Sequence, residues 1–438
     1  MLETVRNAFK LKEIRSRIIY TLLMLVVVRI GTQLPIPGVN GNYFSEWFSG
    51  NSGSAFGFFD AITGGSFERM SVFALNITPY ITSSIIIQLL TIAIPKLEEL
   101  QKDGEEGRKK MTAITRYLTV ALALMESLAM AIGFGKSGLL LEYNALNIIT
   151  AVVTLTAGST VIMWIGERIT ENGVGNGISI VLTINIISRI PQDLTLLFEQ
   201  FVKGKEIAFQ VLNLAIIIAI IIAVTVLTVT LQGAERRIPV QYSRKVQGRK
   251  QIGGQSSYIP LKVNTAGVIP IIFAQSLFMF PLIIMQLLGK SGGNGIGGTI
   301  LKMLNQSNWC DFNEPIYSIG LIVYIVLVIA FAYFYTSITF NPLEIADNMK
   351  KQGGFIPGIR PGKPTSEYLT KILNYIIFIG AVGLVIVAII PIFFEGAFNA
   401  SISFGGTSLI IIVGVIIETL KQIESRMLVR NYKGFLND

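Results

Sequence analysis

The chain has 438 residues, of which 51% are hydrophobic and 14% are charged, and its formal net charge is +9. It contains no histidine, the commonest metal ligand, and one cysteine, Cys310, which excludes an internal disulfide and a cysteine-built metal site. Apolar runs long enough to cross a bilayer recur along the sequence. A water-soluble core could not bury them, so they predict a membrane protein.

Ten apolar windows predict an all-α protein with ten transmembrane helices. They lie at residues 18–34, 71–94, 116–135, 147–165, 177–190, 211–231, 265–288, 316–336, 372–394 and 403–421. An even number of spans places both termini on one side of the membrane. Most of the 36 lysines and arginines lie in loops on that side, so the positive-inside rule predicts cytoplasmic termini. This distribution explains most of the net positive charge without nucleic acid.

A short stretch between the first two spans, FDAITGGSFERM at residues 59–70, does not fit a simple loop. The apolar run 56–63 is far shorter than the roughly 20 residues of a crossing helix, so it should dip into the membrane and return. Non-helical backbone at that depth needs protein or a water-filled cavity around it. A short re-entrant helix closed by Gly64 and Gly65 therefore predicts a cavity open to the outside. The alternative is an amphipathic helix on the outer surface.

The second and seventh spans begin alike, with VFALNITPYIT at 72–82 and KVNTAGVIPIIF at 262–273. Each sequence places an asparagine and then a proline within the first turns of its span. This likeness predicts two pseudo-symmetric halves, 1–205 and 206–438, which are inverted because each has an odd number of spans. Alternatively, proline and asparagine are merely tolerated near helix starts.

The spans expected to line the cavity are rich in isoleucine, and a ring of branched aliphatic side chains would form a dewetted constriction. Abundant isoleucine is also common in lipid-facing and packing positions. Ionisable side chains within the spans are few, the clear ones being Arg29, Glu126 and Glu418. An ion-coupled pathway would be expected to contain more ionisable side chains than these.

Two long cytoplasmic loops, 233–264 and 337–371, carry much of the positive charge. In the first, the runs IPVQY and SSYIPL alternate like short strands and predict a projecting hairpin. Within the second, residues 350–369 are dense in glycine and proline and predict a turn-rich tongue rather than a helix. Its Arg360 could pair with a partner's carboxylates or a phosphate backbone. The alternative is topology control plus attraction to anionic lipid.

Six motifs carry a resemblance along essentially the whole chain. They are LPIPGVN (34–40), NITPYITSSIIIQLL (76–90), ITENGVGNGISI (169–180), GAERRIPVQY (233–242), YIPLKVNTAGVIPIIFA (258–274) and GGFIPGIRPGKPT (353–365). With them the chain resembles the SecY family of protein-conducting channels. That family has no nucleotide-binding or hydrolytic centre, and no GxxxxGK[ST] motif is present here. The resemblance therefore implies a protein that is not an enzyme and needs no cofactor or metal.

The resemblance also implies roles for particular residues. The two halves would enclose an hourglass channel, sealed at its waist by Ile81, Ile85, Ile186, Ile272 and Ile411, with Ile187 as an alternative to Ile186. A plug at about 56–65 would close it from outside, with Phe58, Phe59, Ala61, Ile62, Gly64 and Gly65. A lateral gate between spans 2 and 3 and spans 7 and 8 would include Thr78, Gln88 and Gln275. A motor or ribosome would dock on Arg236, Arg237, Arg244, Lys245, Arg249, Lys250 and Arg360.

The implied function is the channel subunit of the general protein-secretion translocase in the bacterial plasma membrane. It would pass unfolded, signal-bearing polypeptides outward or release transmembrane segments sideways into lipid. The implied partners are the small membrane subunits SecE and SecG, and either the SecA motor ATPase or a translating ribosome, including its RNA. Two alternatives stay open: an inverted-repeat carrier of lipid or a small solute, and a membrane insertase without a through-pore.

Overall fold

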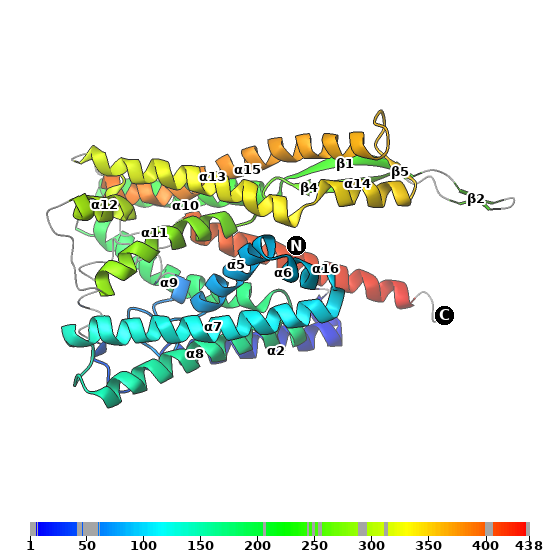
Figure 1. The fold of residues 1–438 in the computed structure, drawn as a ribbon. Coiled ribbons are helices and arrows are strands. Elements are labelled where there is room, and N and C mark those ends of the chain that lie inside the picture. Colours follow the sequence, from blue (N-terminus) through cyan, green and yellow to red (C-terminus); the bar gives the residue numbers. More distant parts are fainter. Residues whose placement is uncertain are drawn as a thin grey trace.

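A computed structural model describes residues 6, 8–41, 46, 60, 62–204, 207–242, 245–247, 250–252, 256–287, 296–310, 314–398 and 406–434. Long helices run side by side along one axis of the molecule (Figure 1). In the described part, every predicted span overlaps one long helix. These are α2 (Lys12–Gly31), α5 (Thr78–Ala93), α7 (Gly104–Phe134), α8 (Ala145–Asn172), α9 (Gly177–Phe201), α10 (Ile207–Gly233), α11 (Ile269–Leu287), α13 (Ser318–Thr339), α15 (Lys363–Phe398) and α16 (Gly406–Gly434).

Length and composition separate these helices into groups. Among the described residues, six helices are long and apolar enough to cross a membrane alone: α7, α8, α9, α10, α13 and α15. A seventh crossing would combine α5 with α6 (Pro95–Lys102), two helices bent by 110° at the break between them. The helices α2, α11 and α16 coincide with the remaining predicted spans but do not meet the same test over the described residues.

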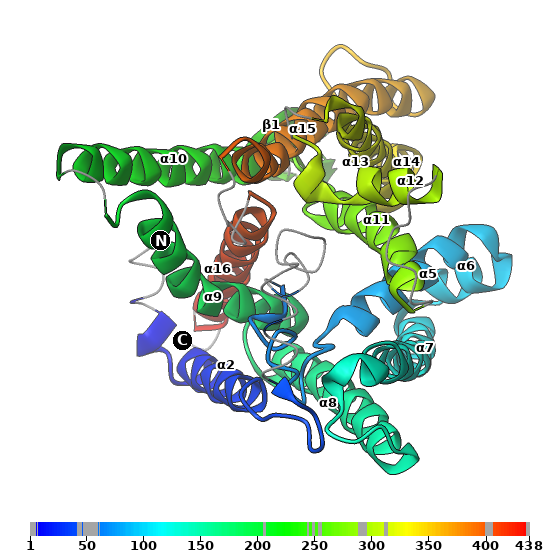
Figure 2. The same cartoon turned by 90° about the vertical axis from the view of Figure 1, so that its left-hand side faces the viewer.

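The same pattern of helix contacts occurs twice along the chain. In the first half α5 packs on α7, α7 on α8, α8 on α9, and α2 on both α8 and α9. In the second half α11 packs on α13, α13 on α15, α15 on α16, and α10 on both α15 and α16. The two sets meet where α9 contacts α10 and α16, and where α7 contacts α11, so that the helices form a ring (Figure 2). This repeat is the arrangement that the two similar span starts predict. The boundary at residue 205 stays a prediction, because residues 205 and 206 lie outside the described part.

The loop 233–264 forms the predicted hairpin. Strand β1 (Glu235–Tyr242) pairs antiparallel with β4 (Ser256–Lys262), from Glu235 opposite Lys262 to Gln241 opposite Ser256. The short strands β2 (Lys245–Gln247) and β3 (Lys250–Ile252) also pair with each other, and β5 (Gly354–Phe355) adds to the free edge of β1. Ile238 and Val240 of β1 and Leu261 of β4 are buried in one hydrophobic cluster with Met349 and Ile356.

The second long loop, 337–371, is less irregular than predicted. Helix α14 (Pro342–Lys351) reaches into the predicted tongue, and α15 already begins at Lys363, so turns occupy only the middle of 350–369. The early start of α15 has a simple cause: Pro364 occupies its first turn, where a missing backbone N–H costs nothing. The smaller elements of the described part are α12 (Ile296–Leu304) and the single turns η1 (Gly135–Leu139), η2 (Gln306–Asn308) and η3 (Pro315–Tyr317).

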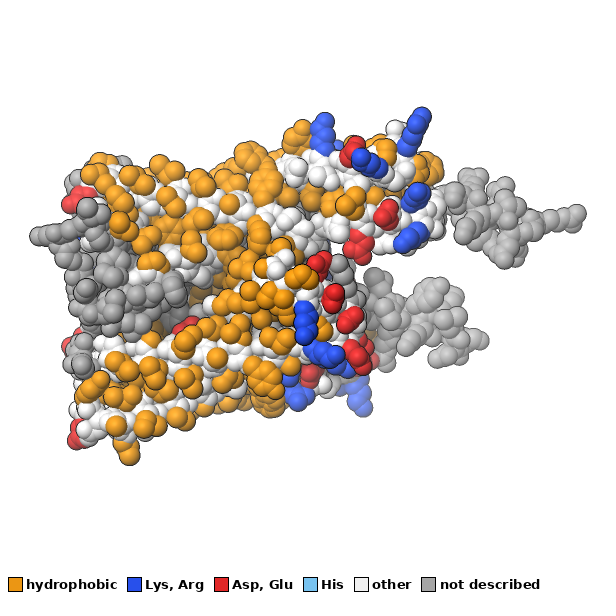
Figure 3. Space-filling view, viewed as in Figure 1, with side chains coloured by type: hydrophobic (Ala, Val, Ile, Leu, Met, Phe, Trp, Pro, Cys, Tyr) orange, Lys and Arg blue, Asp and Glu red, His pale blue; other side chains and the backbone are white. Residues whose placement is uncertain are grey.

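The two chain ends lie at the same end of the helical bundle. Ala8 and Ile14, before and at the start of α2, are buried in one cluster with Val174 and with Ile423 of α16. Lysine, arginine, aspartate and glutamate side chains gather at the end that carries α6, α14 and the sheet, whereas hydrophobic side chains cover the visible flank (Figure 3). An apolar belt with one charged end is the surface expected of a protein embedded in a bilayer.

Candidate functional site

The inner segment, residues 62–77, lies inside the ring of helices, between α2 and α5 in the sequence (Figure 2). The predicted second span began at residue 71, but α5 begins only at Thr78. The prediction failed because Met70 and Asn76 have φ angles of 44° and 50°, which a right-handed helix does not contain.

The asparagines of the two matched span starts also lie before their helices. Asn76 precedes α5 and Asn264 precedes α11, whereas Pro79 and Pro270 occupy the first turns of those helices. The sequence likeness therefore marks two irregular entries, not two kinked helices.

Protein groups satisfy the irregular backbone of the inner segment. The N–H of Val72 donates to the carbonyl of Leu34 at 2.9 Å, and the N–H of Ser71 donates to the carbonyl of Ser66 at 3.0 Å. The hydroxyl of Ser159 on α8 donates to the carbonyl of Asn76 at 3.0 Å. Non-helical backbone can persist at membrane depth only with such partners.

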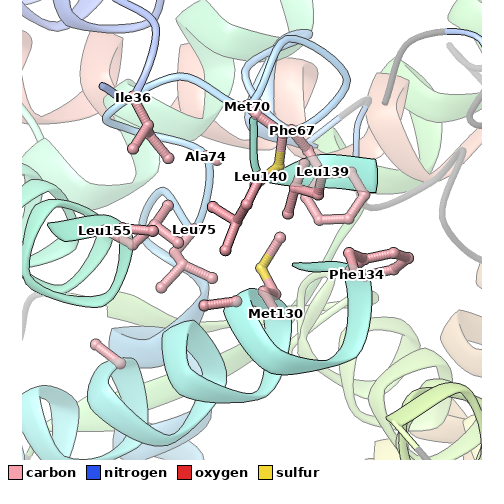
Figure 4. Close-up of a cluster of buried hydrophobic side chains, with 13 residues drawn as sticks. Ile36, Phe67, Met70, Ala74, Leu75, Met130, Phe134, Leu139, Leu140 and Leu155 are labelled. Atoms are coloured by element: carbon pink, nitrogen blue, oxygen red, sulfur yellow. The ribbon is translucent and has the colours of Figure 1, made fainter. Parts of the chain in front are cut away.

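Apolar side chains fix the inner segment to the first half. Phe67, Met70, Ala74 and Leu75 are buried in one cluster with side chains of α7, η1 and α8 (Figure 4). The other side chains labelled there are Ile36, Met130, Phe134, Leu139, Leu140 and Leu155. This part of the segment is therefore a fixed wall of the first half.

Of the predicted plug residues, Ile62, Gly64 and Gly65 are described, whereas Phe58, Phe59 and Ala61 lie outside the described residues. Asp60, Ile62 and Thr63 are helical, and the chain turns at Gly64 and Gly65, where φ is 69° and 79°. A Cβ atom on Gly64 would lie only 2.8 Å from the carbonyl oxygen of Asn185 on α9. Glycine at this position thus permits both the backbone conformation and the close approach to α9.

Next to this turn, four charged side chains form the Arg189 cluster: Asp60, Glu68, Arg189 and Asp193. The Arg189 guanidinium forms an ion pair with the Asp60 carboxylate. It lies 3.2 Å from Oε2 of Glu68 through Nη1 and 3.7 Å from Oδ1 of Asp193 through Nε. The side chains of Arg189, Asp60 and Asp193 are 9%, 0% and 1% exposed, so one arginine faces three carboxylates largely away from bulk water.

Sequence reasoning missed this cluster because Arg189 stood next to the end of the predicted fifth span, 177–190, where a charge needs no partner within the protein. The predicted fifth span ended at residue 190, but α9 continues to Phe201 and carries both Arg189 and Asp193 on a buried face. Their spacing of four residues in an otherwise apolar stretch was the available signal, because charged pairs at that spacing share one helix face. Nothing local identifies Glu68, 121 residues away, as a partner of Arg189.

The structure brings two of the five predicted ring residues together. Ile186 of α9 and Ile411 of α16 are buried in one aliphatic cluster with Ile412, packed against Val268 and Val415. The alternative residue, Ile187, is 39% exposed and lies outside that cluster. The remaining ring residues, Ile81, Ile85 and Ile272, occupy half-buried positions on α5 and α11. Their role as a seal stays a prediction.

The predicted gate residues have three different environments. Thr78 is half-buried at the start of α5, and Gln88 is exposed near its end. Gln275 is buried on α11, and its side-chain oxygen has no hydrogen-bond partner among the described residues. The two halves do meet at α7 and α11, where the seam was expected.

The predicted docking residues that the structure describes lie on elements at the charged end of the molecule. Arg236 and Arg237 are exposed on β1, and the Arg237 guanidinium lies 4.9 Å from the ring centroid of Tyr258. Lys245 and Lys250 belong to β2 and β3, and Arg360 is exposed between β5 and α15. Arg244 and Arg249 lie outside the described residues.

Comparisons with known proteins agree with this architecture. The family model described as SecY matches residues 71–420. The protein translocase subunit SecY of Halalkalibacterium halodurans is 42% identical over 443 residues, covering 100% of both chains.

Solved structures share the fold at lower sequence identity. One concerns a SecY protein whose plug domain stabilises the closed state of the translocation channel and maintains a membrane seal; it has a TM-score of 0.63 and 19% identity. Another is Sec61 in a canine ribosome–channel complex from the endoplasmic reticulum, with a TM-score of 0.61 and 19% identity. Each match covers 94% of this chain and 92% of the other.

Proposed function

The chain belongs to the SecY family of protein-conducting channels, translocase subunits that pass unfolded polypeptides across a membrane and release transmembrane segments into lipid, and we propose how its own residues keep the channel closed. Ile81, Ile85, Ile186, Ile272 and Ile411 form the constriction. The segment 56–65 is a plug on its outer side. The burial of Ile186 with Ile411 between the two halves is the observation that carries this proposal.

A constriction of aliphatic side chains excludes ions because an ion would have to shed its water there without receiving other ligands. The same side chains can separate and let a polypeptide pass, since no directional bonds join them. The plug adds a second barrier beside α9, and the inner segment anchors it to the first half. Thr78, Gln88 and Gln275 contribute to the lateral gate between α5 and α7 on one side and α11 and α13 on the other.

The cytoplasmic sheet and the turn around Arg360 form the docking surface for the driving partner. A ribosome is supported by the Sec61 neighbour, which is part of a ribosome–channel complex. SecA would use the same basic surface, whose exposed arginines can form bidentate contacts with carboxylates or phosphates. SecE and SecG would complete the complex, and its location would be the bacterial plasma membrane with both termini in the cytoplasm.

Deletion of residues 57–65 tests the plug. The variant should reach the membrane at a normal level, conduct ions at rest after reconstitution, and export a reporter whose signal sequence is defective. Each effect follows because opening would no longer require displacement of the segment. Background conductance together with unchanged signal dependence would reject the plug assignment.

A further inference from the structure

The Arg189 cluster joins parts of the molecule that must separate if the plug moves. Asp60 and Glu68 flank the Gly64–Gly65 turn, whereas Arg189 and Asp193 belong to α9. Besides the ion pair, the Asp60 carboxylate accepts a hydrogen bond from the N–H of Glu68 at 2.8 Å. The Asp60 carbonyl accepts hydrogen bonds from Thr63 Oγ1 and from the N–H of Gly65, both at 3.1 Å. Hydrogen bonds within the turn therefore hold Asp60 in place, and its carboxylate connects the turn to Arg189 on α9.

We propose that Arg189 and Asp60 form a latch whose rupture sets the threshold for channel opening, an inference that rests on the plug function proposed above. Two properties suit the pair to this role. It lies away from bulk water, so salt and solvent weaken it little. It also crosses the boundary that would move, because taking the turn off α9 removes the Asp60 carboxylate from the buried Arg189 and leaves Asp193 on the same helix.

The position of the latch on α9 connects it to the seal. Arg189 follows the ring residue Ile186 by three positions, and Asn185 contacts the turn at Gly64. Three residues of helix span about 4.5 Å along the axis, so the ion pair lies roughly one turn beyond the constriction. A change that moves α9 away from α16 to widen the ring would therefore also strain the latch.

The latch is tested in the complete translocase with four variants: Arg189→Met, Asp60→Asn, their combination, and the exchange Asp60→Arg with Arg189→Asp. Each single change should raise export of a signal-defective reporter about tenfold or more over the parent. Arg189→Met leaves the buried Asp60 and Asp193 carboxylates without the arginine, and Asp60→Asn removes the ion pair between the turn and α9. The combined neutral variant should show less than the product of the two single effects, since the partners interact directly. The exchange should restore part of the signal dependence.

Arg69→Met is the matched control. Arg69 lies one residue after Glu68, is exposed, and donates to Gln33. Its replacement removes an arginine from the inner segment, which carries Glu68, without removing Asp60 or Arg189, so signal dependence should stay at the parental level. Membrane levels of all variants, measured by immunoblot, normalise the export values. Arg189→Lys, which keeps the charge, covers the case in which Arg189→Met does not accumulate; it should show a smaller rise.

The outcomes separate the latch from the plug. The latch would be overturned if the two single effects multiplied in the combined variant and the exchange restored no signal dependence. The plug proposal would still stand in that case, provided that deletion of 57–65 opens the channel. If that deletion changes neither conductance nor signal dependence, the plug proposal fails and the latch fails with it. Recovery on exchange together with an open channel in the deletion variant would support both.

Discussion

Replacing Gly64 with alanine should destabilise the closed channel, whereas the same change at Gly65 should not. Both residues have positive φ angles, 69° and 79°, so alanine costs about 1–2 kcal/mol of backbone strain at either position. Their surroundings differ. A Cβ at Gly64 would meet the Asn185 carbonyl oxygen at 2.8 Å and Nη1 of Arg29 at 3.0 Å, but a Cβ at Gly65 would meet nothing closer than Nη1 of Arg189 at 3.6 Å.

Only the clash at Gly64 depends on the contact with α9. Forcing an extra carbon into a packed site costs about 1–3 kcal/mol, and the Asn185 carbonyl is backbone, which cannot rotate away. If the turn leaves α9 on opening, this energy disappears in the open state while the backbone strain remains in both states. The clash should therefore shift the closed–open equilibrium by about 5–150-fold in Gly64→Ala, with no comparable shift in Gly65→Ala.

The assay is resting ion conductance of the purified translocase in planar bilayers, paired with export of a signal-defective reporter in cells. Gly204→Ala provides a further control, because Gly204 has a φ of 84° and no atom of the residues that the structure describes lies within 4 Å of its added Cβ. Equal conductance in the Gly64 and Gly65 variants would refute the argument, since strain common to both positions would then account for the whole effect.

Three further predictions concern other parts of the protein. Ile411→Asn should raise resting conductance, because a polar side chain hydrates the constriction; bilayer recordings at background level would contradict the seal. Arg360→Glu should reduce motor-driven export in membrane vesicles far more than it reduces the level of the protein, since an exposed charge adds little stability but a reversed charge repels a docking partner; equal losses would indicate a folding role. A hydrogen bond from Lys421 lowers the pKa of Glu235 below its usual 4.5, so their contribution to stability should be present above about pH 4.5 and lost as the pH falls through the lowered folded value. Lys421→Met should remove that pH dependence from protease resistance of the β1–β4 hairpin, with a loss of only about 0.2–1 kcal/mol at neutral pH.

Features encoded within one stretch of sequence were predicted well. Apolar runs of bilayer length located every long helix, and period-two alternation located β1 and β4, because both patterns depend only on neighbouring residues. Helix ends were predicted less well. The helices α15 and α16 continue as polar helix past the ends of the predicted spans, and hydropathy gives no signal for those polar turns.

The parts that sequence reasoning could not supply depend on contacts between distant segments. The apolar residues of the inner segment looked like the start of a span, but positive φ at Met70 and Asn76 is set by packing against α7 and α8. In the same way, the sequence around Arg189 gave no sign of its pairing with Asp60 and Glu68, because these residues lie in another part of the chain. Pairing across such a separation becomes visible only when α9 and the inner segment are placed side by side.

The face of α9 that points into the protein carries contacts of both proposed barriers in sequence order. Ile186 meets Ile411 across the two halves, and one turn later Arg189 holds Asp60 beside the glycine turn. Because both contacts lie three residues apart on α9, a displacement of this helix at the proposed constriction should also reach the ion pair. Conversely, an intact latch resists separation of α9 from the inner segment and so favours the closed ring. Binding energy that separates α9 from α16 would therefore act on the seal and the plug together, and the protein needs no second sensor to coordinate them.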